Sequence, residues 1–403
     1  MILTLYIARY MQLTSMGYYG LVTGTVFILM VVLGLRLDYI VGRELVGKTP
    51  HAALAMIRDQ AVFYLFNQAL LAIAMIVFYF AGFSKVNTDT LIFIFILSVL
   101  ENWGDTIFVN LIALGRPLVA NFVFFMRTAF WVIPVIAFGL LWPDFRNINF
   151  VFESWVVGSA FSICIALFAW RKMPWSKVMR TPIDWAWIKK SSKICFLIWL
   201  GSLGGSMGYY LDRFVLDHNM TRDIVGIATF YSSFGSSLFA LIHSGVLSFA
   251  YPHLIDLHKK NDVKGFFAEV RKVAVHVAVL AAILGLGIAI VVPLAGTYFG
   301  RPEFAKYAPT LWLIVFATWI RCNSETLYYI LFARGQDTAL WVGALLYLIP
   351  SLGCNLVLVP HIGLEGIGYS AVISSLMIFF WRGWHVYHTK TSKNVMEDIR
   401  LSE

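Results

Sequence analysis

Apolar runs of about twenty residues recur along almost the whole chain, and they leave few folds open. An α-helix needs a run of this length to cross the hydrocarbon core of a bilayer. Because lipid offers the backbone no hydrogen-bond partner, a spanning segment is either a helix or a strand of a closed barrel. Barrel strands alternate apolar and polar residues, and these runs do not. We therefore predict eleven transmembrane helices, at residues 18–35, 61–83, 89–114, 117–142, 149–170, 192–216, 224–250, 272–295, 305–333, 337–359 and 363–381.

Composition and motifs agree with a membrane protein that performs no catalysis. Hydrophobic residues make up 60% of the 403 residues and charged residues 13%, and mean hydropathy is +0.76. No connecting segment is long enough for a separate soluble domain. We find no H-E-x-x-H, no G-x-S-x-G and no P-loop, so we expect neither an enzyme nor a cofactor. The four cysteines lie in apolar segments without C-x-x-C spacing, so we infer neither a metal site nor a disulfide.

The net charge of +9 follows the loops. Lys and Arg concentrate in every second loop and in the C-terminal tail. They are densest at 171–193, which includes Lys172, and at 259–272. A further basic segment runs from Arg36 to Arg58. By the positive-inside rule such loops face the cytoplasm. The charge therefore predicts topology, and we expect no nucleic-acid partner. The run 171–190 combines basic residues with tryptophans and is predicted to lie on anionic membrane lipid.

The chain begins with a stretch too short to span a membrane. Met1–Ala8 is apolar, but as a helix it extends only about 12 Å. It resembles the end of a helix, so we expect helix 1 to be truncated, or Met1 not to be the natural start. We divide the chain into an N-terminal lobe at 1–170 (the stub and helices 2–6), an amphipathic cytoplasmic linker at 171–191, a C-terminal lobe at 192–388 (helices 7–12) and a cytoplasmic tail at 389–403.

The two halves of the chain resemble each other. With a constant offset of 220 residues, "ENWGDTIFVNLIALGR" at 101–116 aligns with "RCNSETLYYILFARGQ" at 321–336, so that Asp105 meets Glu325. A shorter pair is "GLVT" at 20–23 and "GIAT" at 226–229. Both pairs keep the same order, which indicates parallel repeats. Membrane transporters are commonly built this way, with their binding sites between the repeats.

Three segments carry a family resemblance that covers nearly the whole chain. "ARYMQLTSMGYYGLVTGTVFILMVVLGLRLDYIVGREL" at 8–45 resembles the first loop and second helix of the polysaccharide-exporter branch of the MOP superfamily. Residues 209–254, with Asp212-Arg213 and Tyr251-Pro252, resemble its helices 7 and 8. Residues 330–374, with Gly363 and 366–371, resemble its helices 10–12. The pattern is specific for the family and uninformative about the substrate.

The resemblance implies an all-α polytopic protein of the bacterial inner membrane, with two lobes of about six helices each around a central cavity. The usual work of this branch is Wzx-type flipping of undecaprenyl-pyrophosphate-linked oligosaccharide for O-antigen, capsule or exopolysaccharide. Partners would be that cargo, membrane lipids, and the polymerase and glycosyltransferases of the same process. A MATE-like exporter of small molecules or drugs, an integral-membrane polysaccharide enzyme and a non-transporting scaffold remain as alternatives.

Few charged residues lie inside the predicted spans, and each needs a partner or water because an unpaired charge in the bilayer is costly. We expect Arg127, Arg321 and Arg213 to bind the anionic cargo through bidentate contacts to phosphate. We expect the carboxylates Glu101, Asp105, Glu325 and Asp212 to couple transport to ions or protons. Asp105 and Arg127 should lie level on adjacent antiparallel helices, and Arg321 should pair with Glu325 one turn away. The alternative is that these are structural ion pairs, and that Asp212 and Arg213 anchor a helix end.

Overall fold

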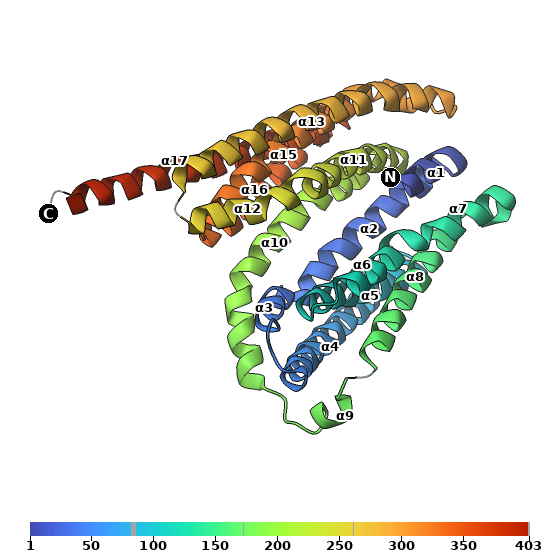
Figure 1. Cartoon of the computed structure of the whole chain (residues 1–403). Coiled ribbons are helices and arrows are strands. Elements are labelled where there is room, and N and C mark those ends of the chain that lie inside the picture. Colours follow the sequence, from blue (N-terminus) through green and yellow to red (C-terminus); the bar gives the residue numbers. More distant parts are fainter. Residues whose placement is uncertain (82–85, 172, 261, 402–403) are drawn as a thin grey trace. The chain divides into compact units, whose positions relative to one another are not determined.

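The computed structural model is helical (Figure 1): its described elements are α-helices, two single turns of π-helix (η1 and η3) and one 3-10 turn (η2). It describes residues 1–81, 86–171, 173–260 and 262–401, and no strand occurs among them. Lys172 of the predicted linker and the last two residues of the predicted tail lie outside the described residues. The elements are α1 (Ile2–Tyr10), α2 (Leu13–Gly34), α3 (Leu37–Glu44), α4 (Pro50–Phe80), α5 (Thr88–Ala113), α6 (Pro117–Phe125), η1 (Met126–Phe130), α7 (Val132–Leu141), η2 (Pro143–Phe145), α8 (Ile148–Trp170), α9 (Trp175–Val178), α10 (Trp185–Asn219), α11 (Arg222–Ile242), η3 (His243–Leu247), α12 (Ser248–Lys259), α13 (Val263–Tyr298), α14 (Glu303–Lys306), α15 (Ala308–Ala333), α16 (Asp337–Ile362) and α17 (Glu365–Leu401).

Within the described residues, helices occupy every predicted span, so the prediction of a multi-pass all-α membrane protein is confirmed. Residues 82 and 83 of the predicted span 61–83 lie outside the described residues. By length and composition, 9 helical segments of the described chain can cross a membrane. The predicted spans at 305–333 and 363–381 correspond to α15 and α17, which are not among those 9. Several helices are longer than predicted: α4 begins at Pro50, α10 at Trp185 and α13 at Val263, and α17 continues to Leu401. Hydropathy marks only the part of a helix that lies in lipid, whereas the helix itself continues into the polar flanks.

The described chain forms two compact units, and their boundaries differ from the predicted ones. Unit 1 comprises Met1–Gly20 and Met207–Glu403, and unit 2 comprises Leu21–Ser206. The N-terminal stub therefore belongs to unit 1, where Thr4 Oγ1 and Ser233 Oγ share a hydrogen bond of 3.1 Å. The boundary near the middle of the chain lies inside α10 and not in the linker at 171–191. The predicted division follows the order of helices along the chain, so it cannot reveal that the first helix belongs to the same unit as the C-terminal helices.

Within unit 1, the first glycine of each paired short repeat lies at a close helix contact. A Cβ atom at Gly20 would lie 2.0 Å from Thr229 Oγ1, and one at Gly226 would lie 2.3 Å from the Leu13 carbonyl oxygen. Only glycine permits backbones to approach this closely, as at other helix contacts in membranes. Gly20 and Gly226 thus let the first turns of α2 pack closely against α11 within unit 1.

In each unit, the helix that carries the predicted charged site residues packs against several other helices. In unit 1, α15 packs against α11, α13, α16 and α17. In unit 2, α5 packs against α3, α4, α6 and α8. A buried apolar cluster that includes Leu37, Tyr64, Leu111 and Val123 fills part of unit 2. The charged residues singled out on α5 and α15 therefore lie within their units, surrounded by other helices.

Candidate functional site

Unit 2 holds a cluster of two carboxylates and one arginine, which we call the Arg127 cluster. Its members are Glu101 and Asp105 on α5 and Arg127 in η1. Arg127 Nε lies 3.7 Å from Glu101 Oε2, and its Nη2 lies 3.6 Å from Asp105 Oδ1. Nη1 also donates a hydrogen bond of 3.0 Å to the Glu101 carbonyl oxygen. The expected pairing of Arg127 with Asp105 is present, and Glu101 is a second partner that we had not paired with it.

Local backbone features of the sequence create this cluster. Arg127 lies in a single turn of π-helix, a feature common at functional sites. Its carbonyl accepts a hydrogen bond of 2.8 Å from Trp131 Nε1. The arginine side chain lies directly against Gly104, where a Cβ atom would come within 2.4 Å of Arg127 Cδ. The absent side chain at Gly104 therefore lets Arg127 lie along α5 between its two acidic partners.

The two carboxylates have different surroundings. Glu101 Oε1 accepts hydrogen bonds from Trp155 Nε1 (2.9 Å) and Ser159 Oγ (3.0 Å), both on α8. Its side chain is 5% exposed, as against 37% for that of Asp105. Arg127 is committed to this cluster and buried. Asp105 is thus the one carboxylate of the cluster with open access to an exchanging proton or ion.

Unit 1 contains a polar cavity of about 60 Å³, which we call the Arg321 pocket. Five helices contribute to it: α10, α11, α15, α16 and α17. Its polar lining residues are Tyr209, Asp212, Ser232, Thr318, Arg321, Tyr347, Ser351, Asn355, Ser370 and Ser375. The predicted residues Asp212 and Arg321, which are far apart in the sequence, therefore face the same cavity.

Arg321 has aromatic neighbours, and in the described chain it forms no ion pair within 4 Å. Its guanidinium carbon lies 4.4 Å from the ring centre of Phe239 and 5.3 Å from that of Tyr209. Among the described residues it forms neither a hydrogen bond nor an ion pair. Cation–π contact with these rings compensates part of the lost hydration. All five N–H groups of Arg321 remain free to bind an anion.

Oxygen atoms gather on the other walls of the Arg321 pocket. Asp212 accepts a hydrogen bond of 2.8 Å from the Arg213 backbone N–H and has no ion-pair partner in the described chain. The buried Asn355 Oδ1 has no hydrogen-bond partner. No group of three or more His, Cys, Asp and Glu suited to a metal ion occurs among the described residues. One carboxylate with amide and hydroxyl oxygens suits a proton or a weakly held monovalent cation better than a transition metal.

The expected pairing of Arg321 with Glu325 is wrong. Glu325 Oε1 instead lies 2.8 Å from Arg382 Nη1, on α17. The same nitrogen donates to the Ser324 carbonyl oxygen and hydroxyl, at 3.0 Å each. We had ended the last span at residue 381 and so treated Arg382 as lying outside the membrane helices. The signal in the sequence was the position of Arg382 directly after the last predicted span, close enough for its helix to continue and bring it to a carboxylate.

We predict that Arg382→Leu destabilises the protein by about 3 kcal/mol, because it leaves a mostly buried carboxylate without its partner. Glu325→Gln should recover most of that loss when combined with it. Thermal unfolding of the purified single and double variants in one detergent measures both effects. If the double variant unfolds at the temperature of Arg382→Leu, the pair is not the reason for the loss.

Arg213 lies outside the Arg321 pocket. It is 5% exposed, and its Nη1 donates a hydrogen bond of 3.0 Å to the Gly20 carbonyl oxygen. Its guanidinium also lies 4.9 Å from the Tyr210 ring centre. Arg213 thus links α10 to α2 within unit 1, which accords with an anchoring role more than with cargo binding.

Comparison with known proteins identifies the fold. No protein-family model and no curated protein matches the sequence. Among solved structures, an inward-facing multidrug resistance MATE transporter of the MOP superfamily matches with a TM-score of 0.71 at 10% identity, over 96% of this chain and 94% of that chain. A variant of the Vibrio cholerae MATE transporter VcmN matches with a TM-score of 0.57 at 13% identity, over 97% and 92%.

A third similar structure is a MOP-superfamily transporter from Pyrococcus furiosus, whose binding pocket is described as reversed in polarity. Its TM-score is 0.56 at 12% identity, over 96% of this chain and 91% of that chain. At such identities the likeness establishes the fold. The chain is a multi-pass membrane protein with the two-lobed, all-helical fold of MOP-superfamily transporters.

Proposed function

We propose that this protein flips undecaprenyl-pyrophosphate-linked oligosaccharide from the cytoplasmic to the outer leaflet of the bacterial inner membrane, for surface polysaccharide biosynthesis. The observation that carries the proposal is the unpaired Arg321 guanidinium in a polar pocket. A planar guanidinium with free donors matches the oxygens of a pyrophosphate. The neighbouring tyrosine, serine and asparagine side chains are donors and acceptors suited to sugar hydroxyls.

The family resemblance supports the same function, because two of the three segments that carry it contribute residues to the Arg321 pocket. The segment 209–254 contributes Tyr209, Asp212 and Ser232, and the segment 330–374 contributes Tyr347, Ser351, Asn355 and Ser370. Outward movement of a negatively charged cargo is favoured by about 2.3 kcal/mol per charge per 100 mV of membrane potential, negative inside. Asp105 and Asp212 are the carboxylates that we propose for ion or proton coupling.

A MATE-like exporter of small molecules is the second candidate, favoured by the MATE fold of the similar structures. Acidic groups in the two sites would suit a cationic drug. An arginine without an ion-pair partner in the same pocket opposes this, because its positive charge repels a cation. An anionic cargo fits the Arg321 pocket better.

Reconstituted protein distinguishes the two functions. We expect proteoliposomes that contain it to expose a fluorescent polyprenyl-pyrophosphate-linked oligosaccharide to an enzyme outside, at a rate at least tenfold above that of protein-free vesicles. Ethidium efflux by a susceptible host that expresses the protein should stay at the background level. Efflux of the drug without movement of the oligosaccharide would replace our proposal by the MATE-like function.

A further inference from the structure

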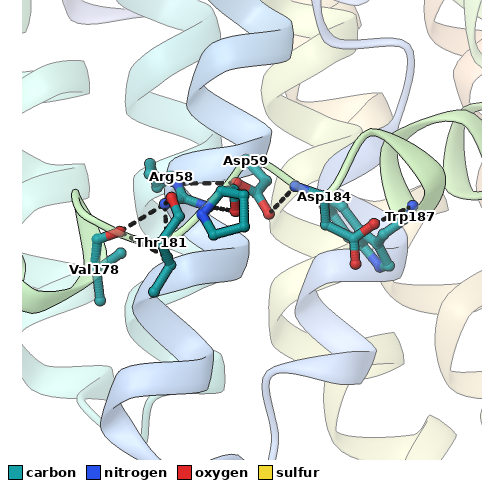
Figure 2. Close-up of polar contacts among 7 residues, drawn as sticks. Arg58, Asp59, Val178, Thr181, Asp184 and Trp187 are labelled. Carbon is teal, nitrogen blue, oxygen red and sulfur yellow. Dashed lines mark hydrogen bonds and ion pairs between the residues drawn. The ribbon is translucent and has the colours of Figure 1, made fainter.

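A buried arginine fastens the segment between α8 and α10 to helix α4 (Figure 2). Arg58 is 7% exposed. Its Nη1 donates to the carbonyl oxygens of Val178 and Thr181, each at 2.6 Å, and to Thr181 Oγ1 at 2.8 Å. Its Nη2 donates to the Pro182 carbonyl oxygen at 2.9 Å. We call this arrangement, together with Asp59, the Arg58 clamp.

Asp59 completes the clamp and connects it to the start of α10. Its Oδ1 accepts from Arg58 Nε (2.9 Å) and Nη2 (2.6 Å), and its Oδ2 accepts from the Asp184 backbone N–H (3.3 Å). Asp184 Oδ1 in turn accepts from the Trp187 backbone N–H (2.8 Å), which caps the helix. Figure 2 shows these side chains in one continuous row. The non-helical backbone at 179–184 is thereby held in one conformation.

The clamped segment and the first turns of α10 present a concentrated positive charge. We call this the connector surface, and its exposed cations are Arg171, Lys177, Arg180, Lys189, Lys190 and Lys193. The exposed acidic residue between Arg171 and Lys193 is Asp184, which the helix cap already uses. Clusters of this size next to a membrane helix attract anionic lipid headgroups.

Apolar side chains on the same surface point to a membrane partner. Met179 and Trp185 are 69% and 61% exposed. The Arg171 guanidinium lies 3.5 Å above the ring of Phe168, which is itself 63% exposed. Tryptophan, methionine and basic residues together are the composition of an interfacial segment that lies at headgroup depth. A nucleic acid or an acidic protein would leave these apolar groups in water.

We propose that the connector surface is a binding site for anionic phospholipid headgroups, and that the Arg58 clamp positions it for this contact. The inference concerns the surrounding lipid and is independent of the cargo. Because the clamp fixes the backbone that carries Lys177 and Arg180, it lowers the conformational entropy lost when a headgroup binds. Removal of the clamp should therefore weaken lipid binding although every exposed cation remains.

Native mass spectrometry of the detergent-solubilised full-length protein, titrated with phosphatidylglycerol or phosphatidylcholine, tests the proposal. We expect the first phosphatidylglycerol to bind at least tenfold more tightly than the first phosphatidylcholine. Each surface cation contributes about fivefold near a membrane, so Lys177→Gln with Arg180→Gln should remove most of this preference. The matched control is Lys260→Gln with Lys264→Gln, an equal charge change on another basic loop, which should keep it.

Arg58→Gln tests the clamp, with Asp59→Asn as the milder variant, and thermal unfolding checks that both are folded. We expect either change to weaken phosphatidylglycerol binding severalfold and to speed tryptic cleavage after Lys177 or Arg180. Wild-type lipid preference in folded clamp variants would overturn the positioning role. Equal losses in the connector and control pairs, or none in either, would overturn the lipid site itself.

Discussion

Arg321→Ala is expected to abolish transport of lipid-linked oligosaccharide while the protein stays folded in the membrane. The substitution removes the guanidinium of the Arg321 pocket, whereas the nearby carboxylate of Glu325 keeps Arg382 as its ion-pair partner. Its cost to folding should therefore be small, whereas each lost charge-assisted contact to a phosphate costs about 1.5–3 kcal/mol. Two such contacts correspond to a loss of more than a hundredfold in transport rate.

Proteoliposome flipping rates, measured at equal protein content, check this result. Arg321→Lys should retain partial transport, because it keeps the charge and loses the planar fork. The control is Arg334→Ala at the end of the same helix, where the side chain donates to the Val386 carbonyl oxygen and does not line the pocket. Full transport by Arg321→Ala would mean that the pocket does not bind the cargo.

Arg127→Leu should act mainly on stability. It leaves Glu101, 5% exposed, without its positive partner, and breaking a buried pair in this way costs about 3–5 kcal/mol. Asp105→Asn should cost far less, because that side chain is 37% exposed. We expect a drop in unfolding temperature for Arg127→Leu several times that for Asp105→Asn.

A double variant separates the structural role of Arg127 from a role in cargo binding. Arg127→Leu with Glu101→Gln removes both buried charges and should regain most of the lost stability. If that folded variant still flips oligosaccharide at the wild-type rate, Arg127 serves only to neutralise its acidic partners. A folded variant that transports nothing would support the proposed contact between Arg127 and the cargo.

The two units differ in how their arginines are used. In unit 2, Arg127 is buried between Glu101 and Asp105. In unit 1, the acidic residue near Arg321 on the same helix is neutralised by Arg382, so that Arg321 stays unpaired. The repeats align Asp105 with Glu325, but the two carboxylates receive their arginines from different helices. This asymmetry makes unit 1 the better candidate for first contact with an anionic cargo.

The sequence by itself determined the features that depend on local composition. Every predicted span is helical where the structure describes it, because about twenty apolar residues satisfy their backbone in lipid only as a helix. The level positions of Asp105 and Arg127 followed from the helix rise on either side of one tight turn. The inward placement of Arg321 followed from the cost of exposing charge to lipid.

Only the tertiary structure decided which distant groups meet. Glu325 pairs with Arg382, which lies on α17 directly after the last predicted span. Arg58, at the end of a predicted basic segment, binds a segment about 120 residues away. The stub of α1 packs in unit 1 although it comes first in the chain. Hydropathy and helical spacing describe one helix at a time. Partners of buried charges are set by the packing of several helices, which no local pattern encodes.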